Sequence, residues 1–232
     1  MAEEPLDNPI WGALTSVHAP LAMRRERAAK YPADVSPLAG LETSEPEAFS
    51  DLAALTPHGE QVAFFTREPI AVPVGWAPIH ERWIDQMVCA APPTAIGQPF
   101  LELSPADGAD MLALASATAP GPFLSGTPRM GRYIGLRDGE GRLVAMAGER
   151  LRLERFTEIS AVCTAPEARG QGYAAALVVA MSRAIFAAGR TPFLHVKTEN
   201  GARRVYERLG FQVRRAIRLT VVTPATEGGQ AA

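Results

Sequence analysis

The spacing of hydrophobic residues is clearest in the second half of the chain. From 172 to 188, Leu177, Met181 and Ile185 recur every four positions, which predicts a helix with one buried face. Apolar runs and alternating patterns predict strands at 132–137, 142–149, 154–164, 193–197 and 211–222. Two more helices are predicted at 105–117 and along the stripe of Ala202, Val205, Tyr206 and Leu209. The order of helix, three strands, helix, strand, helix and strand predicts a mixed α/β sheet.

Local signals mark where these elements begin and end. Ser104 and Pro105 suit the N-cap and the first position of the helix that starts there. The pair Asp138-Gly139 predicts a tight turn between two strands. Gly189 and Gly210 are expected to end the two later helices, because glycine readily takes the left-handed conformation at that point.

Prolines interrupt the first half of the chain at short intervals, so short elements are expected there. The pattern predicts a helix at 45–55 with Ser44 as its N-cap, and strands at 61–66 and 79–88. Residues 91–98, with two consecutive prolines, form the best candidate for a linker. We therefore expect a smaller N-terminal α/β region at 1–96, a second domain at 97–222 and a loose tail at 223–232.

Composition changes this picture only by exclusion. The formal net charge of −2 provides no general attraction to nucleic acid or to anionic lipid, so neither partner is expected. No segment approaches the roughly 20 apolar residues that span a bilayer. Glu3 and Glu4 stand where a signal peptide requires basic residues, so a cytoplasmic location is expected.

The cysteines and histidines do not predict a metal site. Cys89 and Cys163 stand alone in apolar surroundings, which favours simple packing over zinc binding or a disulfide. The four histidines lack the spacing of metal ligands. His195, on a central strand, is expected to be a buried side chain whose hydrogen bonds are satisfied.

The segment that can carry chemistry is a strand that runs through a turn with two glycines directly into a helix. Gly170 and Gly172 let the backbone approach a ligand, and the first N–H groups of the following helix have no internal partners. Together with the helix dipole, these groups favour a phosphate or pyrophosphate, and Arg169 adds positive charge.

Two other interpretations of this turn remain open on the pattern alone. The glycines can serve only the steric needs of a tight strand-to-helix turn. The spacing also fits the G-x-G-x-x-A fingerprint of dinucleotide folds, but the acidic residue expected at the end of the next strand does not appear before Glu199. A predicted hairpin precedes the turn as well, which disfavours the dinucleotide interpretation.

The sequence Arg169-Gly-Gln-Gly-Tyr-Ala174 resembles the signature of the GCN5-related N-acetyltransferases, the GNAT superfamily. The segment from Asn200 to Phe211 resembles the second mark of that family, and it follows at the expected distance on the expected element. Residues 157–166 and 120–123 are similar to the FR47-like branch. The resemblance covers roughly residues 100–222, and 1–96 looks like the partial, diverged domain that precedes the core in some relatives. It implies the GNAT acyl-CoA N-acyltransferase fold, with a mixed and splayed β-sheet.

The resemblance also implies how acetyl-CoA is bound. Backbone groups of Val162 and Thr164, alongside Cys163, would pair with the pantetheine arm, and Asn200 would approach the arm from the facing side. The pyrophosphate would be held by the backbone N–H groups of the glycine turn, namely Arg169, Gly170, Gln171, Gly172, Tyr173 and Ala174. No metal is implied.

The resemblance further implies an acid and a base. Glu158 is the candidate base for the incoming amine, acting directly or through water, although a strand carboxylate can also be a plain surface residue. Tyr206 is the candidate acid for the departing thiolate, although it also completes the apolar stripe of its helix.

The expected function is direct transfer of an acetyl group from acetyl-CoA to a primary amine of a small molecule, amino acid or peptide, within a ternary complex. The alternative is a non-catalytic module that binds or senses acetyl-CoA. The sequence identifies neither the acceptor nor the oligomeric state, monomer or homodimer.

Overall fold

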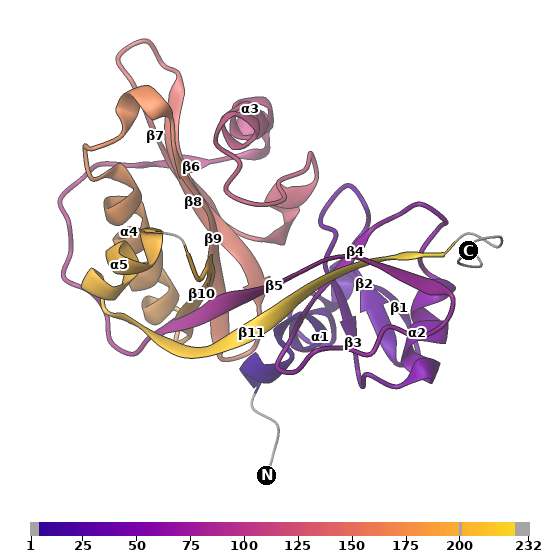
Figure 1. Cartoon of the computed structure of the whole chain (residues 1–232). Helices are drawn as coiled ribbons and strands as arrows, with labels where there is room; N and C mark the ends of the chain where they lie inside the picture. The colour runs from indigo at the N-terminus through magenta and orange to yellow at the C-terminus, as the bar shows by residue number, and fades with distance from the viewer. Residues whose placement is uncertain (1–4, 200, 226–232) are drawn as a thin grey trace. The chain divides into compact units, whose positions relative to one another are not determined.

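A computed structural model describes residues 5–199 and 201–225 (Figure 1). The chain forms two compact units: the first comprises 1–33, 37–84 and 216–232, and the second comprises 34–36 and 85–215. Two long strands, β5 (Trp76–Cys89) and β11 (Phe211–Pro224), contribute residues to both units. The units therefore divide the chain differently from the boundary expected at residue 96. Within the described part of the chain, no helix has the length and apolar character needed to cross a membrane.

The second unit is built on a mixed sheet in which the strand order is β11-β5-β10-β9-β8-β7-β6. Strands β7, β8 and β9 run antiparallel to one another, and β10 runs parallel to β9. Helix α3 covers one face of this sheet, and α4 and α5 cover the other (Figure 1). The bounds are β6 Leu101–Leu103, α3 Gly108–Thr118, β7 Tyr133–Arg137, β8 Leu143–Arg152, β9 Phe156–Thr164, α4 Tyr173–Ala187, β10 Thr191–Lys197 and α5 Ala202–Arg208. The predicted order of elements is confirmed.

Helix α4 carries the apolar stripe that its sequence predicts. Leu177, Met181 and Ile185 are all buried in the main core of this unit, beside Leu194 and Val196 of β10. Burying side chains of this size contributes about 1.5–3 kcal/mol each. The stripe therefore fixes α4 on the sheet directly behind β9 and β10.

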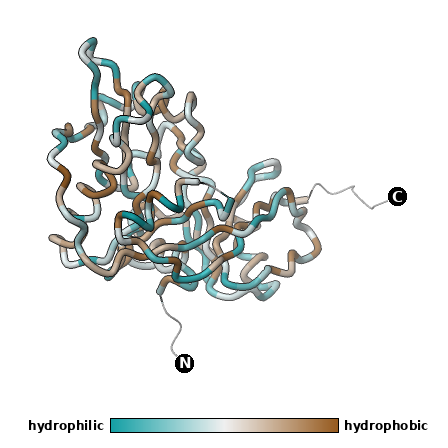
Figure 2. The backbone as a smooth tube through the Cα atoms, turned by 60° about the vertical axis from the view of Figure 1, so that its left-hand side comes forward, coloured by the Kyte–Doolittle hydropathy of each residue, from teal (hydrophilic) through white to brown (hydrophobic). Residues whose placement is uncertain are grey.

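The ends of several elements differ in detail from the prediction. Ser104 and Asp107 form a capping box before α3, as the N-cap prediction requires. The hairpin between β7 and β8 is present, and it is the hydrophilic turn that projects in Figure 2, but its left-handed residue is Gly141 and not Gly139. Asp138 instead accepts hydrogen bonds from the backbone N–H groups of Glu140 and Arg142.

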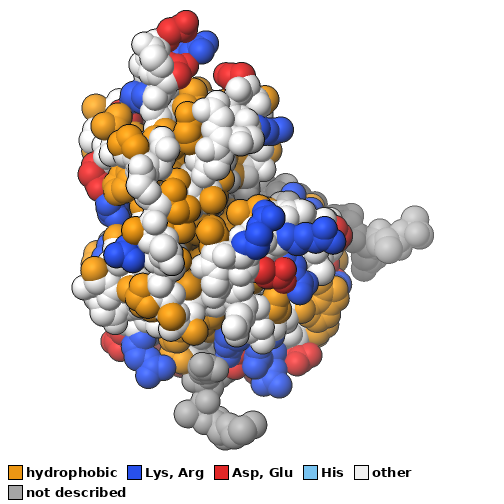
Figure 3. Space-filling model, turned by 90° about the vertical axis from the view of Figure 1, so that its left-hand side faces the viewer, with side chains coloured by type: hydrophobic (Ala, Val, Ile, Leu, Met, Phe, Trp, Pro, Cys, Tyr) orange, Lys and Arg blue, Asp and Glu red, His pale blue; other side chains and the backbone are white. Residues whose placement is uncertain are grey.

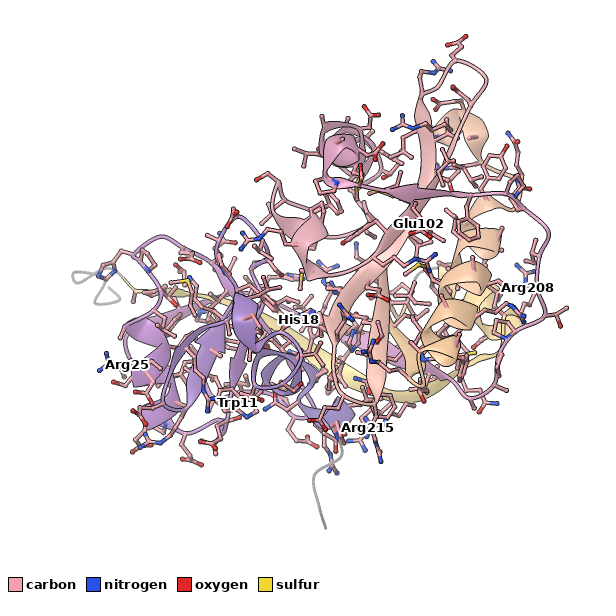
Figure 4. All side chains as sticks on the ribbon, turned by 180° about the vertical axis from the view of Figure 1, so that it is seen from behind. Trp11, His18, Arg25, Glu102, Arg208 and Arg215 are labelled. Atoms are coloured by element: carbon pink, nitrogen blue, oxygen red, sulfur yellow. The ribbon has the colours of Figure 1, made fainter. Side chains whose placement is uncertain are left out.

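Strand β6 is short and lies at one edge of the sheet. Its residue Glu102, labelled in Figure 4, accepts a hydrogen bond of 2.9 Å from Nε of Arg132, next to β7. Three residues give too little alternation to predict such a strand from sequence.

The first unit contains a three-stranded antiparallel sheet, β1-β2-β3, and a group of strands in the order β4-β11-β5. Leu38, the residue before β3, forms an isolated parallel bridge with Ala63 of β4. The rings of Phe49, Phe64 and Trp76 meet edge to face in its core. The bounds are α1 Pro9–Leu14, β1 Met23–Arg25, β2 Ala28–Lys30, β3 Ala39–Leu41, α2 Pro46–Ala53 and β4 Val62–Thr66.

Two expectations for the ends of segments are wrong here. The N-cap of α2 is Glu45, because Pro46 occupies the first helical position, where its missing N–H costs nothing; Ser44 lies one residue too early. Strand β11 runs to Pro224, so the expected tail begins inside a strand that is paired with β4.

Candidate active site

The parallel strands β9 and β10 pair only over their first residues and then part. Their ladder joins residues 156–158 to residues 191–193, and Glu158 opposite Phe193 is its last pair. Strand β9 continues to Thr164 and β10 to Lys197 beyond that point. We call this opening the fork; its two edges expose backbone groups that an extended ligand can pair with.

A bulge bends β9 inside the fork. Ser160 lies opposite Gly148 and Cys163 opposite Met146, so Ala161 and Val162 together face a single residue of β8. Ala161 has a φ of 52°, a left-handed conformation that costs a residue with a side chain about 1–3 kcal/mol. Bulges of this kind are frequent next to active sites, where they aim backbone groups away from the sheet.

Beyond β9 the glycine turn has the geometry that an anion site needs. Gly170 and Gly172 have φ values of 80° and 76°, and no atom lies within 4 Å of a Cβ placed on either residue. Gly172 is the N-cap of α4, no side chain caps this helix, and its first backbone bond is donated by Ala176 to the Gly172 carbonyl. The N–H groups of the first turn therefore lack intrahelical partners.

Charges of both signs lie beside the turn, since Glu167 and Arg169 are both exposed. Arg169 is exposed beside the glycines, and Tyr173 and Ala174 are half-buried. Figure 3 looks onto the side of the second unit that carries α4 and α5, where hydrophobic atoms gather and charged side chains are scattered. Recognition of an anion here rests on the turn itself.

The other expected cofactor contacts lie along the fork. Val162 and Thr164 are half-buried on β9, and Cys163 between them is buried. Burial raises the pKa of the Cys163 thiol, so this residue stays neutral. Asn200 lies outside the described residues. The structure thus brings the glycine turn and β9 together, and their roles in binding stay predictions.

Glu158, the candidate base, lies fully buried at the apex of the fork. Nε of Arg150 donates a hydrogen bond of 2.9 Å to its Oε2, and Nδ1 of His195 lies 2.6 Å from its Oε1. Burial alone would raise the pKa of Glu158, but the charge of Arg150 and the hydrogen bonds from Arg150 and His195 lower it to about 2. A carboxylate held this way is ionised and weakly basic, and it has no exposed surface at which to meet an amine directly.

Tyr206, the candidate acid, lies on α5 with its ring edge against Phe211, the first residue of β11. Desolvation raises the pKa of the phenol to about 12. The hydroxyl therefore keeps its proton near pH 7, as a proton donor must. Arg208, labelled in Figure 4, lies two residues further along, in the last turn of the same helix.

Sequence reasoning missed the polar side chains that surround Glu158. The His195 side chain is only 3% exposed and both ring nitrogens have partners, which confirms that expectation, but one partner is a candidate catalytic residue. Arg150 lies on the neighbouring strand β8, eight residues before Glu158, whereas Gln86 comes from β5, far away in the sequence. The alternation within each strand places polar residues on a buried face, but only the register between strands shows that they meet.

The loop between α3 and β7 closes one side of the sheet near this cluster. Phe123 of the loop packs edge to face on Tyr133 of β7, and the Tyr133 ring lies directly over Gly148 of β8. A Cβ on Gly148 would come within 2.2 Å of that ring, so glycine is required there. Sequence analysis expected this loop over the acceptor side, and that role stays a prediction.

Comparisons with known proteins agree with this geometry. The family model for FR47-like protein matches residues 133–219, which contain the fork, the glycine turn and α5. No curated protein matches the chain. A crystal structure from Novosphingobium aromaticivorans, assigned as an acetyltransferase of the GNAT family, is 36% identical, with a TM-score of 0.90. The match covers 97% of this chain and 100% of that one.

More distant structures share the fold. A GCN5-related N-acetyltransferase from Kribbella flavida has 17% identity and a TM-score of 0.63, with 94% of each chain covered. A GCN5-related N-acetyltransferase-like protein from Streptococcus suis has 12% identity and a TM-score of 0.55, with 91% of each chain covered. The 36% identity to the Novosphingobium aromaticivorans structure over nearly the full length decides the assignment: this chain belongs to the GNAT family of acetyltransferases, on its FR47-like branch.

Proposed function

We propose that this enzyme transfers the acetyl group of acetyl-CoA to a primary amine at the fork between β9 and β10. The observation that carries the proposal is the continuity of three features: the fork, the bulge at Ala161 and the glycine turn before α4. Along β9, the open strand edges of the fork are followed by the unpaired N–H groups of the glycine turn. A ligand made of an extended amide chain that ends in a pyrophosphate fits this arrangement, because its amides can pair with the edges and its phosphates with the N–H groups.

The donor would lie along β9. Backbone groups of Val162 and Thr164 would pair with its pantetheine arm beside the neutral thiol of Cys163, and Asn200 would approach from the other side. The N–H groups from Arg169 to Ala174 would hold the pyrophosphate, where the dipole of a 15-residue helix adds to them. A backbone N–H near Val162 would polarise the thioester carbonyl.

The chemistry requires one bond to form and one to break. The amine nitrogen attacks the thioester carbon, the C–S bond breaks, and the amine loses one proton while the sulfur gains one. Tyr206 would supply the proton to the sulfur. The amine proton would leave to water, because Glu158 is buried and its carboxylate is held by Arg150 and His195.

The acceptor we propose is an amine on a small molecule, an amino acid or a peptide. The competing function is a module that binds acetyl-CoA without turnover. Two features favour the enzyme: a phenol that keeps its proton on α5, and an ionised cluster at the apex of the fork.

Calorimetric titration with acetyl-CoA tests the site. Gly172→Glu places a negative side chain where the pyrophosphate would lie, so binding should be lost. Gly172→Asn is the matched control, because asparagine tolerates a positive φ and adds no charge. If wild-type protein and Gly172→Glu bind alike, the site is misplaced. Turnover of any member of an amine panel then separates the enzyme from the binding module.

A further inference from the structure

A chain of polar side chains crosses five neighbouring strands of the second unit, one residue from each. In sheet order they are Arg150 of β8, Glu158 of β9, His195 of β10, Gln86 of β5 and Arg214 of β11. Nε2 of Gln86 lies 3.1 Å from Nε2 of His195, and an Nη1 hydrogen of Arg214 is donated to Oε1 of Gln86 over 2.9 Å. A row of this kind inside a sheet has to satisfy every donor and acceptor it contains.

The direction of each hydrogen bond follows from Arg214. A guanidinium has only donors, so the Gln86 oxygen faces Arg214 and the Gln86 amide nitrogen faces His195. That nitrogen is also a donor, so Nε2 of His195 must accept. The imidazole proton then sits on Nδ1 and is donated to Glu158 over 2.6 Å.

Burial, more than the surrounding charges, keeps the imidazole neutral. Glu158 and Arg150 face it from β9 and β8, Gln86 with Arg214 faces it from β5 and β11, and the Phe193 ring packs on it within its own strand. Burial lowers the pKa of His195, Glu158 opposes that shift, and Arg150 adds to it. A second ring proton would also point at the Gln86 N–H group.

The contact between His195 and Glu158 lies where the fork opens. Glu158 and Phe193 form the last pair of the ladder, and His195 lies two residues further along β10. The hydrogen bond therefore ties the two strands together just beyond the point at which their backbones part.

We propose that His195 is a positioning residue whose Nδ1–H, fixed by Gln86 and Arg214, clamps Glu158 across the fork and sets the width at which β9 and β10 receive the donor. This inference rests on the proposed function in one respect, namely that the donor occupies the fork. Glu158 is then a fixed anchor of the clamp. The proton of the incoming amine leaves by another route.

Nitrogen-15 NMR of the imidazole tests the clamp without any ligand. The expected spectrum shows a neutral ring with its proton on Nδ1. Gln86→Glu replaces the amide by an acceptor of the same shape, so both ring nitrogens should carry protons near pH 7. A wild-type ring protonated on Nε2, or on both nitrogens, overturns the proposal.

Acetyl-CoA titrations then test the function of the clamp with a matched pair of variants. His195→Asn places an amide N–H near the position of Nδ1 and should keep the wild-type Kd within about threefold. His195→Gln places its amide near Nε2, loses the bond to Glu158, and should weaken binding by about tenfold or more. Equal affinity of the two variants overturns the clamp.

The pair also separates this inference from the proposed function. If wild-type protein binds no acetyl-CoA while the NMR result holds, the proposed function fails and the hydrogen-bond chain stands.

The dependence of turnover on pH is a second test of the clamp. Since Glu158 is not the proton acceptor, Glu158→Gln should lower the rate without removing the acidic limb of the pH–rate profile. If Glu158→Gln loses the acidic limb, Glu158 is the base, and the proposal that it mainly anchors the clamp is wrong.

Discussion

Each unit contains two parallel strands joined by a helix, β3 and β4 in the first unit and β9 and β10 in the second. In both units the two strands make a short contact and then part, so the first unit has a fork as well, but the two forks differ in chemistry. In the first unit, Leu38, just before β3, forms one parallel bridge with Ala63 of β4, and residues of both strands line a pocket. In the second unit, β9 and β10 share a short ladder and then part. The topology of the chain opens both forks, so the loop that joins strand to helix decides what each can hold.

Those loops have opposite character. The loop before α4 has two left-handed glycines and Arg169. The loop before α2 has Glu42 and Glu45, and the helix itself begins with Pro46, which has no N–H group. We therefore expect an anion to bind at the loop before α4 and not at the loop before α2. Both units share the arrangement of parting parallel strands, so this arrangement alone does not predict phosphate recognition. We expect that property to depend on a few residues in the loop that joins strand to helix.

The largest expected effect is a fall in kcat on changing Tyr206, which lies on α5, a helix with no counterpart after β4 of the first unit. Helix α5 follows β10, whereas no helix follows β4 in 67–75. Tyr206→Phe keeps the ring contact with Phe211 and removes the proton donor, so kcat should fall about a hundredfold with little change in KM for acetyl-CoA. Steady-state kinetics check this, and an unchanged kcat would remove Tyr206 from the chemistry.

The second prediction exchanges the character of the two helix starts. Ala174→Glu gives α4 the acidic residue that α2 carries as Glu47, and acetyl-CoA binding should weaken by about tenfold or more. Thermal stability should hold, since an acidic residue in the first turn suits the helix dipole. Glu47→Ala in α2 is the control and should leave acetyl-CoA binding unchanged.

The third prediction concerns the dependence of folding stability on pH. The first fork has the apolar residue Leu38 at its apex, whereas the second has the ionised Glu158. The folded-state pKa of His195 is lowered, so its contribution to stability is complete above its unfolded pKa and declines as the pH falls below about 6.5. The decline cannot exceed about 1.4 kcal/mol per pH unit for one proton. Glu158, with a pKa lowered to about 2, adds a separate loss as the pH falls from about 4.3 toward that value.

Denaturant unfolding at a series of pH values measures both steps. His195→Asn should abolish the upper step and retain the lower one. If stability in that variant still declines near pH 6 as it does in the wild type, another group carries the upper step.

The smallest effect is expected at the exposed guanidinium of the glycine turn. Arg169→Gln should raise the Kd for acetyl-CoA only about threefold, because an exposed charge is screened by solvent. The difference from wild type should shrink as salt is added. A loss as large as that of Ala174→Glu would mean that Arg169, and not the helix start, dominates recognition.

The parts of the fold that could be predicted are those with a local cause. The four-residue spacing of Leu177, Met181 and Ile185 predicts α4, and Gly170 and Gly172 predict a turn that needs left-handed residues. Strands β1, β2 and β3 were missed because each has three residues, and two of them are wholly buried without alternation.

The parts that could not be predicted depend on register. Nothing in the sequence near Ala161 marks a bulge, since alanine rarely takes a positive φ and the bulge depends on how β9 aligns with β8. The contact between Glu158 and His195 joins residues 37 positions apart. Glu158 itself was found from the motif, but its burial and its ion pair with Arg150 follow only from the packed sheet.

The division of β5 and β11 between the units has a consequence for how the chain is made. The first unit needs the last part of β11, where residues 218–222 pair with β4, and these emerge from the ribosome only after the whole second unit has been synthesised. The region translated first is therefore completed last, and until then one edge of β4 awaits its partner. A chain released after residue 215 should contain a second unit able to protect itself from protease and a first unit that cannot.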